Sequence, residues 1–274
     1  MPFTTSHPAL VLPLKMMWPS RFSLTGLMAG AMAPDLLYFL LADTSERGFS
    51  HSWSGLVVFC IPAGVLFGLV FHRLFKYHAI TNLPWFLQRP LSGLADSDFS
   101  LPRAADWITY VGSVMIGVLS HFAWDSFTHP WGEMAQMIPS LQRPVAVLGL
   151  SRPVCRWLQH LSTLWGGLAV LWFLMKSTHM PRPTRQQPRR GLLAKTAFWI
   201  GGLITAWACG ASMIWLYNDL YGWHLGRGEN YQAALTTFGL ASWAGFFYFV
   251  CTYTLLNRLL RRKMTRRQRV DQPQ

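Results

Sequence analysis

The chain has 274 residues, of which 51% are hydrophobic, 15% are aromatic and only 13% are charged. A soluble protein of average composition carries about a quarter charged residues, so this composition excludes a disordered chain, a coiled coil and almost any soluble nucleic-acid-binding protein. The formal net charge of +13 is therefore expected to follow membrane topology and not to form a nucleic-acid-binding surface.

Long apolar segments predict a polytopic membrane protein. A helix that crosses a bilayer needs about 20 mostly apolar residues, and six segments meet or nearly meet that length. They lack the strict alternation of barrel strands, so we expect an all-α fold, an integral membrane helical bundle of about six transmembrane helices. The predicted spans are Phe22–Ala42, Trp53–Phe75, Trp107–Phe127, Leu161–Met175, Leu192–Tyr217 and Ala233–Leu256.

Two of these predicted helices are irregular. The first contains Pro34 followed by Asp35, so it is a candidate for a broken helix. The fourth is short, so we expect it to include residues of the preceding loop or to lie tilted. The N-terminal 20 residues carry His7 and internal prolines where the apolar core of a cleavable signal peptide would lie, so no such peptide is predicted.

The distribution of Lys and Arg predicts the orientation, because cytoplasmic loops are enriched in these residues. Nineteen of the 24 fall on one predicted side, which supports six spans with both termini in the cytoplasm. The basic tail, residues 258–274, is interpreted as a topology anchor in contact with anionic lipid and not as a nucleic-acid-binding segment. The five Lys and Arg residues on the other predicted side are Arg47, Arg143, Arg152, Arg156 and Arg227.

A Pro- and Arg-rich segment, residues 176–195, divides the chain. We expect residues 1–175 to form a helical membrane domain that holds nearly all ionisable groups at membrane depth. Residues 176–195 would form a basic cytoplasmic loop, 196–257 a two-helix membrane segment and 258–274 the basic tail. The chain shows no internal repeat.

Ionisable residues within membrane helices are costly, and their default interpretation is functional. Asp35 lies in the first predicted span, His51 just before the second, and His121 and Asp125 at the far end of the third. His121 and Asp125 are four residues apart and share one helix face. The predicted topology places all four residues at one membrane depth. Imidazole and carboxylate groups suit first-row divalent metals, so we predict a divalent metal site, with zinc as the first candidate.

His129 and Glu133 follow this cluster and are the candidate catalytic residues. Pro130 disfavours helical geometry at His129, so His129 is expected at the helix end. Glu133 is the candidate general base, and a solvated loop residue is its alternative interpretation.

A purely structural polar cluster is the alternative for the whole set. Asp35 would then cap a broken helix, and His121 would form a hydrogen bond with a neighbouring helix. His51 would be an interfacial residue between serines that cap a helix N-terminus.

Four tracts of the sequence resemble a known family. The tracts MPFTTSHPAL, AGAMAPDLLYFL, SHSW and LSHFAWDSFTH resemble the uncharacterised bacterial membrane family DUF4184, a domain of unknown function. The same order of motifs is similar, more distantly, to the LexA-regulated inner-membrane metal-dependent hydrolases. This resemblance implies a multi-pass inner-membrane protein with metal-dependent hydrolase activity.

The motifs of the distant relatives also imply individual ligands. Their early His corresponds to His7, which the resemblance adds to the candidate metal ligands. Leu37 stands where the relatives usually carry a second acidic residue, which favours a one-metal site over a two-metal site. The other implied positions are Pro34, Asp35, His51, His121 and Asp125.

His7 conflicts with the predicted topology, because a cytoplasmic N-terminus places it on the opposite side from His51 and His121. Either residues 8–33 form a re-entrant pair that brings His7 to the outer side, or His7 is not a ligand. Prolines at positions 8, 13 and 19 make this segment irregular. Irregular backbone is tolerated at membrane depth only where protein buries it.

Two classes of function remain open at this point. The first is a metal-dependent hydrolase that cleaves a phosphoryl or ester bond of a lipid or lipid-linked substrate at the outer face of the inner membrane. The second is a transporter or other non-enzymatic membrane protein that uses the Asp/His cluster for protons or metal ions. The oligomeric state is not predicted.

Overall fold

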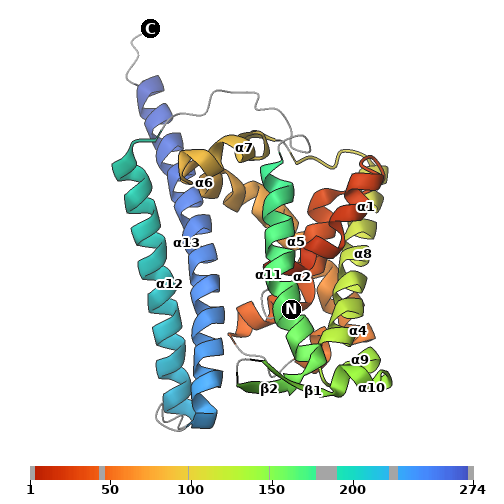
Figure 1. Cartoon of the computed structure of the whole chain (residues 1–274). Coiled ribbons are helices and arrows are strands. Elements are labelled where there is room, and N and C mark those ends of the chain that lie inside the picture. Colours follow the sequence, from red (N-terminus) through yellow and green to blue (C-terminus); the bar gives the residue numbers. More distant parts are fainter. Residues whose placement is uncertain are drawn as a thin grey trace. The chain divides into compact units, whose positions relative to one another are not determined.

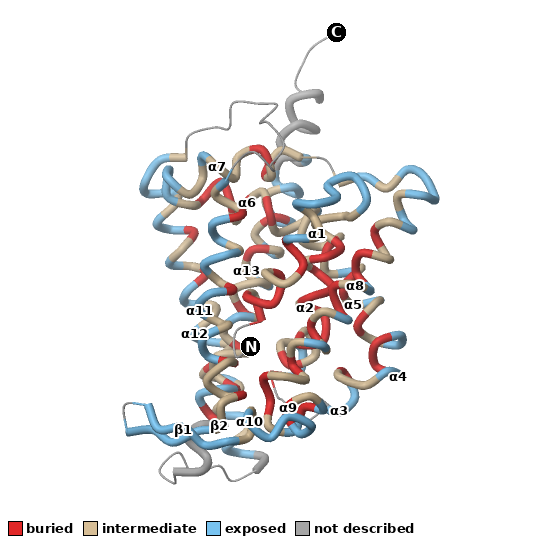
Figure 2. Tube along the Cα trace, turned by 45° about the vertical axis from the view of Figure 1, so that its right-hand side comes forward, coloured by how far each residue is buried: buried red, intermediate tan, exposed pale blue. Residues whose placement is uncertain are grey.

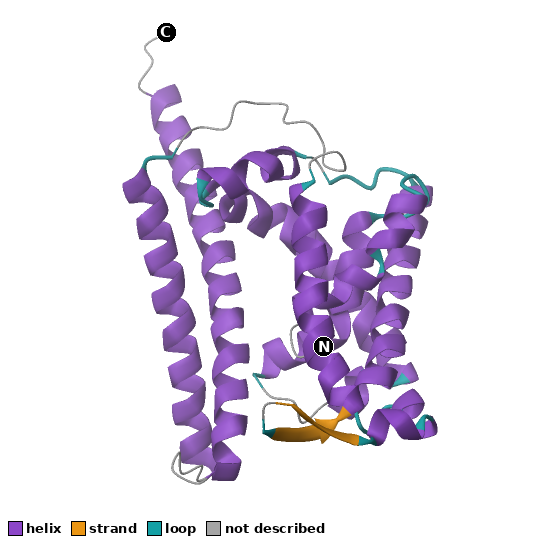
Figure 3. Cartoon of the chain, viewed as in Figure 1, coloured by secondary structure: helices purple, strands orange, loops and turns teal. Residues whose placement is uncertain are grey.

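The computed structural model describes residues 4–42, 47–97, 99–147, 149–176, 190–221 and 228–270. Helices dominate these ranges, and their sheet is a two-stranded hairpin (Figure 3). The predicted all-α class is confirmed, as are the six predicted spans. The helices long and apolar enough to cross a membrane are Leu24–Leu41, Trp53–Thr81, Ala104–Met137, Val154–Met175, Leu192–Asp219 and Ala233–Leu260.

The chain forms two compact units. Unit 1 comprises residues 1–37, 45–69 and 99–179, and unit 2 comprises residues 38–44, 70–98 and 180–274. Late in the chain the division between the units falls after residue 179, within the predicted basic loop of residues 176–195. Residues 70–98, however, belong with the C-terminal helices, because their partners are more than 100 residues away in sequence and no local pattern reveals them.

Unit 1 is a bundle of helices with short irregular pieces (Figure 1). Its long helices supply the framework, and the second span enters it as consecutive α- and π-helical turns. The elements are η1 (Thr4–Leu10), α1 (Leu12–Met17), α2 (Leu24–Leu41), α3 (Arg47–Ser50), α4 (Trp53–Gly55), η2 (Leu56–Cys60), α5 (Ile61–Val70), α8 (Ala104–Thr128), α9 (Glu133–Met137), α10 (Pro139–Gln142), β1 (Pro144–Val147), β2 (Leu150–Pro153) and α11 (Val154–Met175).

Small residues allow α2 and α8 to pack closely. A side chain added at Gly30 would run into the backbone of Val114, and one added at Gly117 would run into the backbone of α2. Small residues at helix interfaces let the backbones of membrane helices approach each other. The core beside this contact includes Tyr110 and Val118, and Figure 2 shows buried stretches in α2, α5 and α8.

The N-terminal segment forms a hairpin of helices with α2. The 3-10 helix η1 and the short helix α1 precede a turn, after which α2 runs back past them (Figure 1). Lys15 stabilises this turn, because its ammonium group donates to the carbonyl oxygens of Pro19 (2.5 Å) and Phe22 (2.7 Å). Helix α2 continues through Pro34, so the predicted break does not occur.

The fourth span begins at Val154, which confirms that it includes residues of the preceding loop. A hairpin that the sequence analysis did not anticipate lies directly before it. Strands β1 and β2 are antiparallel, with Val145 opposite Arg152. Gly149 adopts a φ of 80°, a value that favours glycine. The hairpin rests on α11, where the Trp157 indole donates to the carbonyl oxygen of Val145.

Unit 2 is built on a pair of long helices, α12 and α13. Aromatic rings of α12 and α13 pack against one another, and the rings of Trp199 and Phe246 stack with centroids 5.4 Å apart. Arg190 links the pair to the short helices of the unit through the ring of His78 (3.1 Å) and the hydroxyl of Tyr253 (3.0 Å). The elements are η3 (Phe71–Phe75), α6 (Lys76–Thr81), α7 (Trp85–Asp96), α12 (Leu192–Tyr221) and α13 (Gly228–Val270).

Two predicted segments lie partly outside the described residues. Residues 177–189 of the predicted basic loop and 271–274 of the predicted tail belong to this group. The preceding part of the tail continues α13 as a helix.

Candidate metal centre

The four residues predicted to bind a metal come together within unit 1. Asp35 comes from α2, His51 from the turn between α3 and α4, and His121 and Asp125 from one face of α8. His121 and Asp125 are buried, and Asp35 and His51 keep only 10% and 8% of their side-chain surface exposed. Three separate chain segments therefore meet at one buried point.

The polar atoms of these side chains face one another at short range. The two imidazole Nε2 atoms of His51 and His121 are 3.3 Å apart. His121 Nε2 lies 3.6 Å from Asp35 Oδ1 and 3.6 Å from Asp125 Oδ2. His51 Nε2 lies 3.8 Å and 3.6 Å from the same two oxygens. Five distances among four candidate ligand atoms thus fall between 3.3 and 3.8 Å.

These five distances are close to those of a zinc site, and the candidate ligand atoms fall into two overlapping groups, Asp35, His51 and His121 and His7, His121 and Asp125, each within 4.8 Å. With metal–ligand bonds of about 2.0–2.2 Å, the ligand atoms of a regular tetrahedron lie roughly 3.3–3.6 Å apart. The observed distances lie at or slightly above this range. Two nitrogen and two carboxylate ligands are also a donor set that zinc accepts.

Three of the four candidate ligands make a second contact on the side that faces away from the cluster. The Thr4 hydroxyl donates to Asp35 Oδ2 over 2.7 Å. His121 Nδ1 lies 2.8 Å from the carbonyl oxygen of Ala31, and His51 Nδ1 lies 3.0 Å from the Ser50 hydroxyl. A contact at Nδ1 orients an imidazole so that Nε2 faces the metal, which is the usual arrangement behind metal-binding histidines.

The turn that carries His51 is fixed by its own hydrogen bonds. The Ser52 side chain caps α4 by accepting from the amide of Gly55 at 3.0 Å, as predicted for a helix N-cap. The buried Cys60 thiol donates to the carbonyl oxygen of Ser50. Burial lowers the pKa of His51, although Asp125 and Asp35 act in the opposite direction. The lowered pKa favours the neutral imidazole, the form that binds metals.

His7 lies at the same site. Its ring stacks on the ring of His121 with centroids 3.7 Å apart, and its Nε2 is 3.8 Å from Asp125 Oδ1. The ligand atoms of His7, His121 and Asp125 all lie within 4.8 Å of one another. Of the two alternatives for His7, this position agrees with the re-entrant one. It also places η1 beside the Asp/His cluster.

His129 is buried at the end of α8, where its position as the residue that ends the helix was predicted. Its Nδ1 lies 3.4 Å from Asp125 Oδ2. Its Nε2 lies 2.8 Å from the side-chain amide of Gln159 on α11. His129 thus touches the cluster through Asp125.

Glu133 is not brought to the cluster. It begins α9 with an exposed side chain. Within the described ranges, no hydrogen bond or ion pair joins it to the four candidate ligands. This position suits a solvated residue and does not support the predicted role as a general base.

Two polar contacts of the site were missed by the sequence analysis. Thr4 lies in the same tract as His7, but only the histidine was considered. Gln159 is a buried amide near the start of α11, among polar residues such as Arg156 and His160. It precedes the predicted span, which begins at Leu161, so its polarity did not stand out in the sequence.

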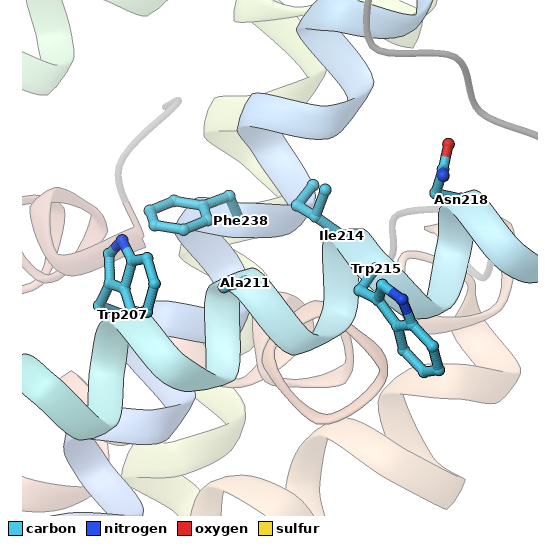
Figure 4. Close-up of a pocket in the computed structure, with 6 residues that line it drawn as sticks. All are labelled: Trp207, Ala211, Ile214, Trp215, Asn218 and Phe238. Carbon is cyan, nitrogen blue, oxygen red and sulfur yellow. The ribbon is translucent and has the colours of Figure 1, made fainter.

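A pocket of about 370 Å³ lies in unit 2 and is lined by none of the residues of the Asp/His cluster. Its lining carries no titratable side chain, so it offers no chemistry comparable to the Asp/His cluster. Figure 4 shows its residues, Trp207, Ala211, Ile214, Trp215, Asn218 and Phe238, on α12 and α13.

Comparisons with known proteins place the chain in a family. A family model described as "Domain of unknown function (DUF4184)" matches residues 1–254. Searches of curated proteins and of solved structures found no match. Since the family model covers nearly the whole sequence, including every residue of the cluster, the chain belongs to the DUF4184 family.

Proposed function

We propose that this protein is a metal-dependent hydrolase of the bacterial inner membrane. Asp35, His51, His121 and Asp125 would hold one divalent metal ion, with zinc as the first candidate. The substrate would carry a phosphoryl or ester bond and belong to the lipids or lipid-linked precursors at the outer face of the membrane.

One observation carries this proposal, the convergence of two imidazole nitrogens and two carboxylate oxygens at 3.3 to 3.8 Å. Burying a divalent cation is costly unless its charge is compensated. Two carboxylates and two neutral imidazoles give such a cation a site of zero net charge. Without a cation, two buried carboxylates stand close to the same imidazole, which is an expensive arrangement for a merely structural cluster.

The roles of the residues follow from these positions. A bound divalent ion supplies Lewis acidity, which polarises a phosphoryl or carbonyl oxygen of the substrate. Asp35 and Asp125 balance the charge, and His51 and His121 complete the ligand set. The contacts from Thr4, Ser50 and Ala31 keep these side chains in place before any ligand binds.

The surroundings of His51 support a substrate with an apolar part. The ring of Phe122 lies against His51 with centroids 5.8 Å apart, and Trp53 contacts Phe122 edge-on. Trp53 is 75% exposed. Asp35 and His51 are the least buried of the four candidate ligands, so the cluster is most accessible next to these aromatic side chains. Large exposed aromatic residues are typical of the membrane interface, where a lipid substrate would approach.

Hydrolysis is tested with the full-length protein in nanodiscs, loaded with Zn²⁺ and given a panel of lipid phosphates and lipid esters. Wild type should release product from at least one class, and Asp35→Asn should lower the rate at least as far as it lowers metal occupancy. If wild-type protein with bound metal cleaves no member of the panel, the hydrolase proposal is wrong while the metal site stands.

The N-terminal hairpin of helices favours a transporter as the second candidate. Broken helical segments that reach an ion site are a feature of transporters, and η1 brings His7 to this cluster. Zn²⁺ uptake into proteoliposomes separates the two functions. Flux in the absence of any turnover would favour the transporter.

A further inference from the structure

A chain of polar contacts leads from the candidate metal centre into α11. Arg156 Nη1 donates to Gln159 Oε1 at 2.8 Å. Gln159 Nε2 lies 2.8 Å from His129 Nε2, and His129 Nδ1 faces Asp125. Gln159 and His129 are both buried, so these contacts are shielded from water.

The donors and acceptors along these contacts determine which nitrogen of His129 carries the proton. A guanidinium group can only donate, so the atom of Gln159 that faces Arg156 is its oxygen. The amide nitrogen therefore faces His129, and this nitrogen also can only donate. His129 Nε2 must then be the acceptor and carries no proton. In a neutral imidazole the proton consequently resides on Nδ1.

That proton lies on the side of the ring that faces Asp125. His129 Nδ1 donates to the backbone carbonyl oxygen of Asp125 at 3.2 Å, and the carboxylate Oδ2 of the same residue lies within ion-pair distance at 3.4 Å. The same Oδ2 lies 3.6 Å from His51 and His121. Outer partners that hold the backbone and the carboxylate of a metal ligand fix its orientation and strengthen metal binding.

We propose that Gln159, oriented by Arg156, holds His129 as the Nδ1–H tautomer, so that His129 is a positioning residue for Asp125. Both ring nitrogens are then engaged, and His129 acts neither as a metal ligand nor as a general base. This inference rests on the proposed metal site, and it replaces the catalytic role that the sequence suggested for His129 with a positioning role.

The test uses Co²⁺ titration of the detergent-purified full-length chain, followed by its visible absorption. An asparagine amide nitrogen is attached to Cγ, as Nδ1 is in histidine, so His129→Asn keeps a donor toward Asp125 but has no basic nitrogen. We expect its Co²⁺ affinity to stay within about twofold of wild type, the usual scatter where no interaction is lost. His129→Leu, which has no donor, should lower the affinity about 10–100-fold.

Gln159→Leu completes the test as a double-mutant cycle. Gln159→Leu alone removes the contact to His129 and should lower Co²⁺ affinity about tenfold, the usual effect of losing a residue that orients a metal ligand. Combined with His129→Asn it should have little further effect, because asparagine needs no partner to fix a tautomer. Thr163→Val is the matched control, since the Thr163 hydroxyl donates to the backbone carbonyl of Gln159 and leaves the side-chain amide of Gln159 untouched. Melting temperatures without metal report any general loss of stability.

Two results would overturn the inference, and they are distinguishable. If His129→Asn loses Co²⁺ as fully as His129→Leu, His129 is a ligand or acts through its basic nitrogen, although wild-type binding still supports the metal site. If wild type shows no saturable Co²⁺ binding, the proposed metal site fails, and the positioning role fails with it.

Discussion

Asp35, His51 and His121 each direct one polar atom toward the centre of the cluster and a second toward a fixed partner. Asp35 shows this division most clearly, because Oδ1 faces the two imidazoles while Oδ2 accepts from Thr4. His121 divides its nitrogens in the same way, with Nδ1 toward Ala31 and Nε2 toward the centre. The outward contacts decide which atoms are left to bind a metal.

The Thr4 contact leads to a prediction for metal affinity. Thr4→Val keeps the shape of the side chain but removes the hydroxyl that donates to Asp35. We expect Zn²⁺ affinity to fall about 10–100-fold, the usual cost of losing an outer contact. Thr4→Ser retains the hydroxyl and should bind nearly as well as wild type. Equal affinity for all three proteins in a competition titration would show that Thr4 does not support Asp35.

The exposure of Glu133 predicts a small effect of its substitution. Surface substitutions away from special features usually change stability by less than about 0.5 kcal/mol, so Glu133→Gln should leave metal content and turnover close to wild type. A positioned general base would contribute about 10²–10⁴-fold to the rate. A loss of that size with metal content unchanged would restore the catalytic role of Glu133.

Among single residues, the sequence identified the candidate ligands better than the residues that contact and orient them. His121 and Asp125 were recognisable because a four-residue spacing is a local property of a helix. Thr4 and Asp35 are 31 residues apart, and His129 and Gln159 are 30 apart. Contacts over such separations depend on how the helices pack, which no local pattern specifies.

The contact between α2 and α8 positions the site at the level of the elements. Gly26, Gly30 and Gly117 remove side chains where the two helices meet. The close approach brings the Ala31 carbonyl oxygen of α2 within 2.8 Å of His121 on α8. Asp35 lies one helical turn further along α2 and so reaches the same imidazole.

Substitution of Gly30 should therefore damage both stability and metal binding. The added methyl group of Gly30→Ala meets the backbone of Val114. Overpacking of this kind costs about 1–3 kcal/mol, and separation of the helices would draw Asp35 away from His121. Gly112→Ala on α8 is the control, because nothing lies within 4 Å of its added carbon. Melting temperature and Zn²⁺ affinity should fall for Gly30→Ala alone, and equal behaviour of both variants would contradict this account.

Hydropathy was sufficient to predict the spanning elements, but their ends and the non-spanning pieces were not predictable. The short helices η1 and α1, which precede α2, are too short for an apolar window to reveal, and the resemblance pointed to this segment only through His7. The β1–β2 hairpin is short and largely exposed, so it lacks the alternating burial that marks a strand in sequence.

For the molecule as a whole, the charge distribution predicts which ends of the helices face the cytoplasm. Leu150 lies in the hairpin next to the start of α11, at the expected outer side, and is 57% exposed. Leu192 begins α12 at the expected cytoplasmic side and is 82% exposed. Both positions accept a cysteine without disturbing a buried contact.

Thiol labelling of intact cells with an impermeant reagent tests this orientation. Leu150→Cys should be labelled from outside above the background of the four native cysteines, and Leu192→Cys should be labelled only after the cells are opened. The reverse pattern would invert the orientation and move the candidate site to the cytoplasmic face.

The central claim is that the Asp/His cluster binds one divalent metal ion, and elemental analysis of the purified protein tests it most directly. Wild-type protein, washed free of loosely bound ions, should retain close to one equivalent of zinc or another first-row divalent metal. His121→Ala and Asp35→Ala should each lose it, while Gly112→Ala should keep it. Wild-type protein without stoichiometric metal after incubation with Zn²⁺, or a His121→Ala variant that retains the full equivalent, would contradict the account.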